Sequence, residues 1–191
     1  MTAADAPDPV RPAPLAVIVY DNGALADRVL GEAAAALAAR GWRLGGVVQT
    51  SHPREGRRKC DMTLTDLRSG ETVLISNDLG DESEGCRLNT DACAYAGVLV
   101  ERALAAGIDL LVINRFGKQE AEGRGFRGAI AEALLAGIPV ALAVSRVNLP
   151  ACRLFAGDDL HHLAPTTEAL LAWCAAAPPR RLNVGAEVVA G

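Results

Sequence analysis

The chain has 191 residues, half of them hydrophobic and 22% charged, which predicts a single domain with a well-filled core. The net charge of −4 and the 4% of aromatic residues argue against a general nucleic-acid binder, because such proteins need a basic surface and base-stacking rings. The five cysteines show no C-x-x-C spacing and no apolar run reaches the roughly 18 residues of a membrane span, so we expect a reduced, cytoplasmic protein without membrane contact or a metal site.

The first half of the chain reads as strands and helices in alternation, followed by a hairpin. Residues 1–14 contain four prolines and are expected to be a disordered tail. Apolar runs and helical spacing then predict a strand over 15–20, a helix over 24–40 and a strand over 44–50. After a basic loop at 54–59, two short strands over 60–67 and 71–76, joined by a turn, predict an inserted β-hairpin at about 60–76.

The second half continues the alternation. We expect a helix capped by Asn89 or Thr90 and ending near 106, followed by a buried strand over 109–113 and a helix over about 125–136. A strand over 139–144, a short helix over 150–155 and a strand over 160–163 come next. The last helix is capped by Thr166 or Thr167 and ends near 176, and a tail follows over 177–191. This order predicts one α/β domain over 15–176, with a three-layer, mostly parallel sheet into which the hairpin is inserted.

The buried strand at 109–113 ends in a loop crowded with polar residues and glycine. In open parallel sheets, ligands lie outside the carboxyl ends of the strands. Arginine presents paired donors that match oxyanions, and glycine lets the backbone approach a ligand closely. We therefore predict a ligand site for a small anion formed by Asp21, Asn22, Gly23, Cys86, Arg87, Asn114, Arg115, Gly117, Lys118 and Arg124.

Two features of this prediction leave alternatives open. Arg115 and Lys118 could instead pair with Glu120 and Glu122 in a solvated ion-pair loop. Cys86 follows Gly85 and precedes Arg87 at the start of a helix, which favours a reactive thiolate, but a small buried core residue is the interpretation that the sequence favours more.

The first strand-to-helix turn, YDNGALADR at 20–28, is not a phosphate-binding P-loop. It has one glycine, no lysine and no hydroxyl residue where the pattern Gly-x-x-x-x-Gly-Lys-Ser/Thr would require them. Asp21 and Asp27 add negative charge that would repel a phosphate, and Arg28 is the only cation nearby. The alternative interpretation of these residues is an ordinary strand-to-helix turn without a ligand site.

Several runs make residues 15–175 resemble a known family. GWRLGGVVQT, DLRSGE and LLVINRFGKQEAEGRGF occur in an order and spacing that resemble the corresponding segments of the P-loop nucleoside-triphosphatase family first described from thermophiles. The chain is more similar still to a bacterial family of unknown function, domain of unknown function 2478, which shares GCRL at 85–88 and NRFGKQEAEGRG. Some members of that family are linked to molybdenum transport.

The departures from the triphosphatase pattern concern the hydrolytic residues. The resemblance implies a Walker lysine for phosphate, and a Ser/Thr and a strand-end Asp for Mg²⁺. Here the lysine and hydroxyl are absent, Asn114 replaces the Asp, and Arg115 replaces a Glu that would help to position water. An amide lacks a carboxylate's charge, and arginine cannot act as a base at neutral pH. The resemblance therefore implies a P-loop NTPase-like fold with degenerate Walker motifs.

Three hypotheses for function follow. The first is a P-loop-derived domain that binds a nucleotide or a small anion such as phosphate, sulfate or molybdate without efficient hydrolysis. The second is an active nucleoside triphosphatase, in which Glu120 or Glu122 would be catalytic and Mg²⁺ the cofactor. The third is a regulatory protein-interaction module, which could be a homodimer, linked to molybdenum metabolism.

Overall fold

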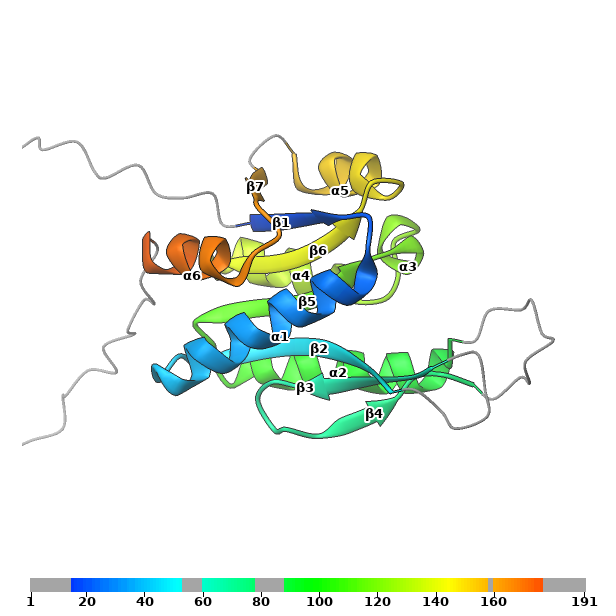
Figure 1. Ribbon diagram of the computed structural model, residues 1–191. Coiled ribbons are helices and arrows are strands. Elements are labelled where there is room, and N and C mark those ends of the chain that lie inside the picture. Colours follow the sequence, from blue (N-terminus) through cyan, green and yellow to red (C-terminus); the bar gives the residue numbers. More distant parts are fainter. Residues whose placement is uncertain (1–14, 53–59, 78–87, 158–159, 177–191) are drawn as a thin grey trace, which may run out of the picture.

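A computed structural model describes residues 15–52, 60–77, 88–157 and 160–176. In these residues, seven strands form one sheet in the order β4-β3-β2-β5-β6-β1-β7 (Figure 1). The predicted tails, the basic loop at 54–59, and both Cys86 and Arg87 lie outside the described residues.

The sheet is mostly parallel, as predicted. Neighbouring strands pair in parallel from β2 through β5, β6 and β1 to β7, whereas β3 pairs antiparallel with β2 and with β4. The predicted hairpin therefore extends the main sheet at its β2 edge. The strands are β1 Leu15–Tyr20, β2 Leu44–His52, β3 Asp61–Asp66, β4 Thr72–Leu74, β5 Leu110–Phe116, β6 Val140–Ser145 and β7 Leu160–Leu163.

Helices cover both faces of the sheet and complete the predicted three layers. One core cluster lies between the sheet and α1 with α6, and the other between the sheet and α2, α4 and α5 (Figure 1). None of the helices in the described ranges is long and apolar enough to cross a membrane. The helices are α1 Gly23–Ala39, α2 Thr90–Ala105, α3 Lys118–Ala121, α4 Arg127–Leu135, α5 Leu149–Ala156 and α6 Thr167–Ala176.

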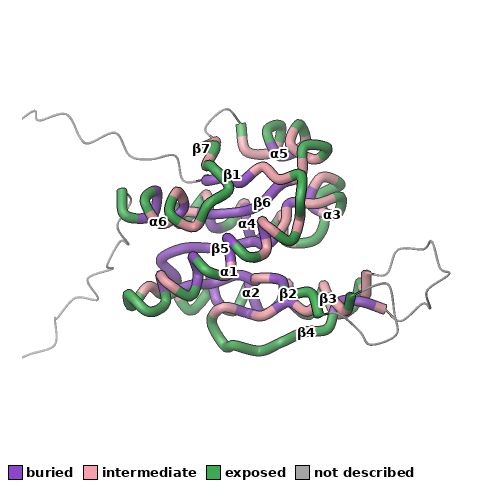
Figure 2. The backbone as a smooth tube through the Cα atoms, viewed as in Figure 1, coloured by how far each residue is buried: buried purple, intermediate pink, exposed green. Residues whose placement is uncertain are grey.

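The central strands are buried because they consist almost entirely of apolar residues. Figure 2 shows β5 and β6 inside the molecule, whereas the edge strand β4 is largely exposed. A strand covered on both faces needs no polar alternation, which is why LLVI and VALAV read as continuous apolar runs. This arrangement leaves polar groups of β5 only at its carboxyl end.

Gly46 brings β2 against β5. Its φ of +101° lies in a region that other residues rarely adopt. A Cβ at this position would lie 1.9 Å from the carbonyl oxygen of Val112 on the neighbouring strand. The close approach of the two strands therefore depends on the absence of a side chain here.

The structure differs from the prediction at the end of β5. The strand does not stop at 113 but continues through Asn114 and Arg115 to Phe116, and the following loop contains the short helix α3. The prediction placed the strand end at the first polar residue. Asn114 remains in the strand because its side chain, although polar, is buried and hydrogen-bonded.

Two cysteines, Cys152 and Cys174, belong to the core, and this has a consequence for their chemistry. Burial raises the pKa of Cys152 from an ordinary 9.0 to about 11, and that of Cys174 to about 12. We expect a thiol reagent to modify the exposed Cys60 in the native protein but to reach Cys152 and Cys174 only after unfolding. Counting modified thiols with and without denaturant tests this.

The same two thiols should make the fold less stable in alkali. Above about pH 9 the unfolded chain releases thiol protons that the folded chain retains, so the free energy of unfolding falls as pH rises towards the folded-state values of about 11 and about 12. Below about pH 9 this contribution is fully present. Denaturant unfolding at about pH 8 and about pH 10, with Cys152→Ala as the comparison, measures it; an identical pH dependence in that variant would contradict the assignment.

Candidate functional site

A β-bulge shapes the carboxyl end of β5. The pairing of β5 with β6 shifts between Ile113 and Phe116, so one extra residue is accommodated there. Ile113 and Phe116 consequently face the same core cluster although they are three positions apart. Asn114 and Arg115 lie between them, and both side chains reach Asp27 on α1. In a regular strand, adjacent side chains would point to opposite faces.

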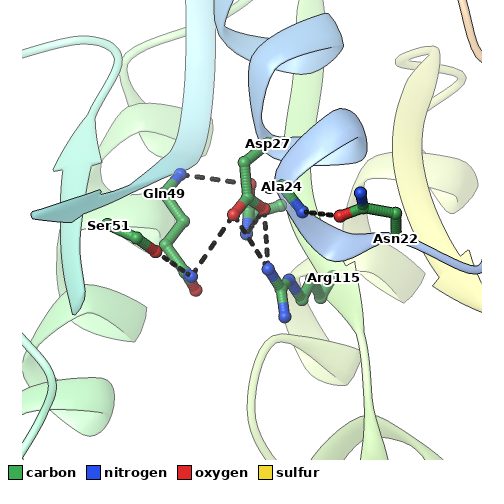
Figure 3. A network of polar contacts seen from close by, with 7 residues as sticks. Asn22, Ala24, Asp27, Gln49, Ser51 and Arg115 are labelled. Atoms are coloured by element: carbon green, nitrogen blue, oxygen red, sulfur yellow. Dashed lines mark hydrogen bonds and ion pairs between the residues drawn. The ribbon is translucent and has the colours of Figure 1, made fainter. Parts of the chain in front are cut away.

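Asp27 is the centre of the polar network at this site (Figure 3). Its two carboxylate oxygens accept hydrogen bonds from Arg115 Nη2 at 2.9 and 2.8 Å. Asn114 Nδ2 donates to it at 3.1 Å and Gln49 Nε2 at 3.5 Å. Asn114 Oδ1 in turn accepts the backbone amide of Gln49 at 3.1 Å, and Gln49 also contacts Ser51. Strands β2 and β5 are thereby joined to α1 through one carboxylate.

Arg115 lies over the first turn of α1. A Cβ added to Gly23 would stand 2.8 Å from Arg115 Nη2, so the guanidinium rests directly on this glycine. The ring of Tyr20 lies 5.5 Å from the guanidinium carbon, in cation–π geometry. Asn22 caps the helix, its Oδ1 accepting a backbone amide at 3.0 Å. A cation and a helix N-terminus thus meet at one point, where both favour negative charge.

Asp21 makes a separate, exposed contact beside this turn. Its Oδ1 accepts a hydrogen bond from Arg146 Nε at 2.7 Å, and this hydrogen bond lowers the pKa of Asp21. Both side chains are more than 70% exposed, so the pair contributes little to stability.

The loop after β5 folds around the carboxylate of Glu120. One oxygen accepts the amide of Gly117 at 2.8 Å and the other that of Phe126 at 3.0 Å. Gly125 adopts a φ of +59°, and a Cβ there would lie 2.1 Å from Glu120 Oε1. Arg127 adds a contact to the Glu120 carbonyl at 3.0 Å. The glycines of this loop thus make room for the carboxylate of Glu120, which belongs to the loop itself.

The remaining charged residues of the loop pair with one another at the surface. Glu122 contacts Lys118 at 3.7 Å and forms a short ion pair with Arg124. Arg124 Nε also donates to Gln119 Oε1 at 2.9 Å. Lys118 is 85% exposed. The alternative of a solvated ion-pair loop thus describes Lys118, Arg124 and Glu122, but not Arg115, whose partner is Asp27.

The structure divides the predicted site residues into two groups. Asn22, Gly23, Asn114 and Arg115 gather around Asp27, while Gly117, Lys118, Glu120, Glu122 and Arg124 contact one another in the loop. Sequence reasoning noted Asp27 only as a charge hostile to phosphate. The signal that could have found this role is helical spacing. Asp27 lies three residues before Leu30 and seven before Ala34, and both of these are buried, so its carboxylate lies on the face of α1 that is turned to the core. A carboxylate in such a place needs a basic partner.

The residues at this site do not fit the Mg²⁺ centre of a nucleoside triphosphatase. Magnesium prefers carboxylate, hydroxyl and water oxygens. Asn114 Oδ1 already accepts an amide, the Asp27 carboxylate is bound by Arg115, and the turn before α1 has no hydroxyl. The described residues also contain no group of three His, Cys, Asp or Glu side chains that could hold a metal ion.

Comparison with known proteins agrees with this architecture. The crystal structure of THEP1 from the hyperthermophile Aquifex aeolicus superposes with a TM-score of 0.53 and 13% sequence identity, over 81% of this chain and 90% of that one. The fold is therefore P-loop NTPase-like, as predicted.

Two further comparisons concern the sequence. The molybdenum import ATP-binding protein ModC 2 of Bradyrhizobium diazoefficiens is 35% identical over 164 residues. The match covers 86% of this chain but only 18% of that relative. Residues 15–173 match the model of the family described as "Protein of unknown function (DUF2478)". The chain therefore belongs to the DUF2478 family.

Proposed function

We propose that this chain binds a nucleotide or a small oxyanion at the carboxyl edge of its sheet and does not hydrolyse it efficiently. The observation that carries the proposal is the position of Arg115 on Gly23, where a guanidinium and the first turn of α1 meet. Helix N-termini and arginine both favour phosphate-like groups.

The comparisons support a nucleotide as one ligand class. A P-loop NTPase-like fold places its ligand site at the first strand-to-helix turn, which here is the turn covered by Arg115. The name of the Bradyrhizobium relative describes it as ATP-binding and as a molybdenum importer. Because this chain spans only 18% of that relative, both ATP and molybdate remain proposed ligands for it.

The carboxylates of Glu120 and Glu122 are already engaged in other contacts, and this disfavours efficient hydrolysis. Glu120 is 5% exposed and its two oxygens accept backbone amides, so it is committed to holding the loop. Glu122 is paired with Lys118 and Arg124. Neither carboxylate is placed to act as the base or metal ligand that phosphoryl transfer to water requires.

Calorimetry on the wild type and on Arg115→Ala tests the proposal. We expect the wild type to bind at least one of ATP, ADP, phosphate, sulfate or molybdate, and the variant to bind it roughly 10- to 100-fold more weakly, because charge-assisted hydrogen bonds are lost. Arg43→Ala is the matched control: Arg43 also pairs with an aspartate, Asp109, but at the opposite end of β5. Mg²⁺-dependent phosphate release at ordinary enzyme rates would contradict the absence of efficient hydrolysis.

A second candidate is a regulatory protein-interaction module, which an apolar surface favours. Leu154 on α5 is 89% exposed and Val147, in the turn before α5, is 87% exposed, and exposed Pro150 of α5 lies between them in the sequence. If the calorimetry detects none of the five ligands, the first proposal fails and this face becomes the surface to test for association.

A further inference from the structure

Asp27 blocks the donor that an incoming anion needs most. A guanidinium has two edges at which a pair of parallel N–H groups can grip an oxyanion, and Nη2 belongs to both. Both Asp27 oxygens lie within 2.9 Å of Arg115 Nη2. Nε of the same side chain is buried and has no hydrogen-bond partner among the described residues. Asp27 thus already holds the donor that the two edges share, and an incoming anion has to compete with it for Nη2.

The network allows that release without stranding the carboxylate. Asn114 Nδ2 and Gln49 Nε2 also donate to Asp27, at 3.1 and 3.5 Å. Asn114 is itself held by the Gln49 amide, so it stays in position when Arg115 moves. The side chain of Asp27 is 10% exposed, which gives it some contact with water as well. Two neutral donors thus remain for Asp27 after the guanidinium has left.

We propose that Asp27 is an internal competing anion that sets the affinity of this site for phosphate-bearing ligands. This inference rests on the proposed function. A carboxylate held beside Arg115 competes at an effective concentration in the millimolar range or above, so it weakens the binding of every such anion by the same factor. A ligand gains full access to the guanidinium only when it displaces Asp27 from Arg115 Nη2.

The test compares Asp27→Asn with the wild type, using ADP and inorganic phosphate as probes without Mg²⁺. We expect the variant to bind both probes about tenfold or more tightly than the wild type, since a charged competitor has been removed. Asp27→Glu keeps the charge and should therefore bind both probes less tightly than Asp27→Asn. Asp109→Asn, which breaks the Arg43 pair at the other end of β5, is the control for loss of an ion pair.

The outcomes separate this inference from the proposed function. If the wild type binds ADP through Arg115 but Asp27→Asn binds it no more tightly, the competing anion is refuted while the proposed function stands. If neither protein binds either probe, the competing anion is refuted, and the proposed function is then decided by the calorimetry with all five ligands. Should Asp27→Asn not fold by circular dichroism, Asp27→Ser provides the same loss of charge.

Discussion

Replacing Gly46 with alanine is expected to lower the free energy of unfolding by about 3–5 kcal/mol, or to leave the chain unfolded. The new Cβ would lie 1.9 Å from the Val112 carbonyl oxygen, which belongs to the backbone of the central strand and cannot rotate away. The residue would also have to hold a φ of +101°. Backbone strain of this kind costs about 1–3 kcal/mol, and the clash with β5 adds to it.

Gly31→Ala is the matched control for this experiment. Gly31 lies inside α1, and a Cβ there would meet nothing within 4 Å. The same substitution should therefore raise stability by about 0.5–1 kcal/mol through better helix propensity. Urea unfolding followed by circular dichroism measures both variants. An unfolding midpoint for Gly46→Ala equal to that of the wild type would mean that β2 does not approach β5 as described.

Replacing Glu120 with glutamine should destabilise the protein by about 1–3 kcal/mol without reducing any phosphate release. Glutamine has a single oxygen, so one of the two amides that the carboxylate now satisfies, from Gly117 or Phe126, would face an NH₂ group. A buried donor without an acceptor carries a cost of this size. Amide hydrogen exchange should accelerate across the loop at 117–126.

Glu122→Gln separates this structural role from a catalytic one. Glu122 is 40% exposed and only makes surface ion pairs, so its loss should change stability by about 0.5 kcal/mol or less. If Glu120→Gln keeps wild-type stability but loses Mg²⁺-dependent nucleotide hydrolysis, the carboxylate is catalytic and the triphosphatase alternative is correct.

The fold could be predicted because its signals are local. Apolar runs such as VALAV define buried strands, and Asn89 caps α2. Their alternation determines the layer architecture through general rules. The end of β5 could not be predicted in this way. The bulge at Asn114 and Arg115 depends on how β5 aligns with β6, a strand some 25 positions later in the chain, and no local pattern carries that register.

The contacts among the predicted site residues could not be predicted from the sequence. Asn114 and Arg115 were identified from the loop, yet their common partner Asp27 lies 87 and 88 positions earlier on α1. The bulge decides that both side chains turn towards Asp27. Glu120 was identified as a possible catalytic group because it could replace the carboxylates that the triphosphatase alternative needs for Mg²⁺. Its burial arises from the turn at Gly125, which only the folded loop displays.

The connection between β1 and α1 consists of Asp21 and Asn22 alone. The Walker pattern, in which a loop encircles a phosphate, is eight residues long, so this junction offers less backbone than such a loop uses. Under the proposed function, a ligand would therefore meet the first turn of α1 and the side chain of Arg115 instead of being enclosed by a loop. Point substitutions alone would not create an enclosing loop here, and inserted residues would be needed as well.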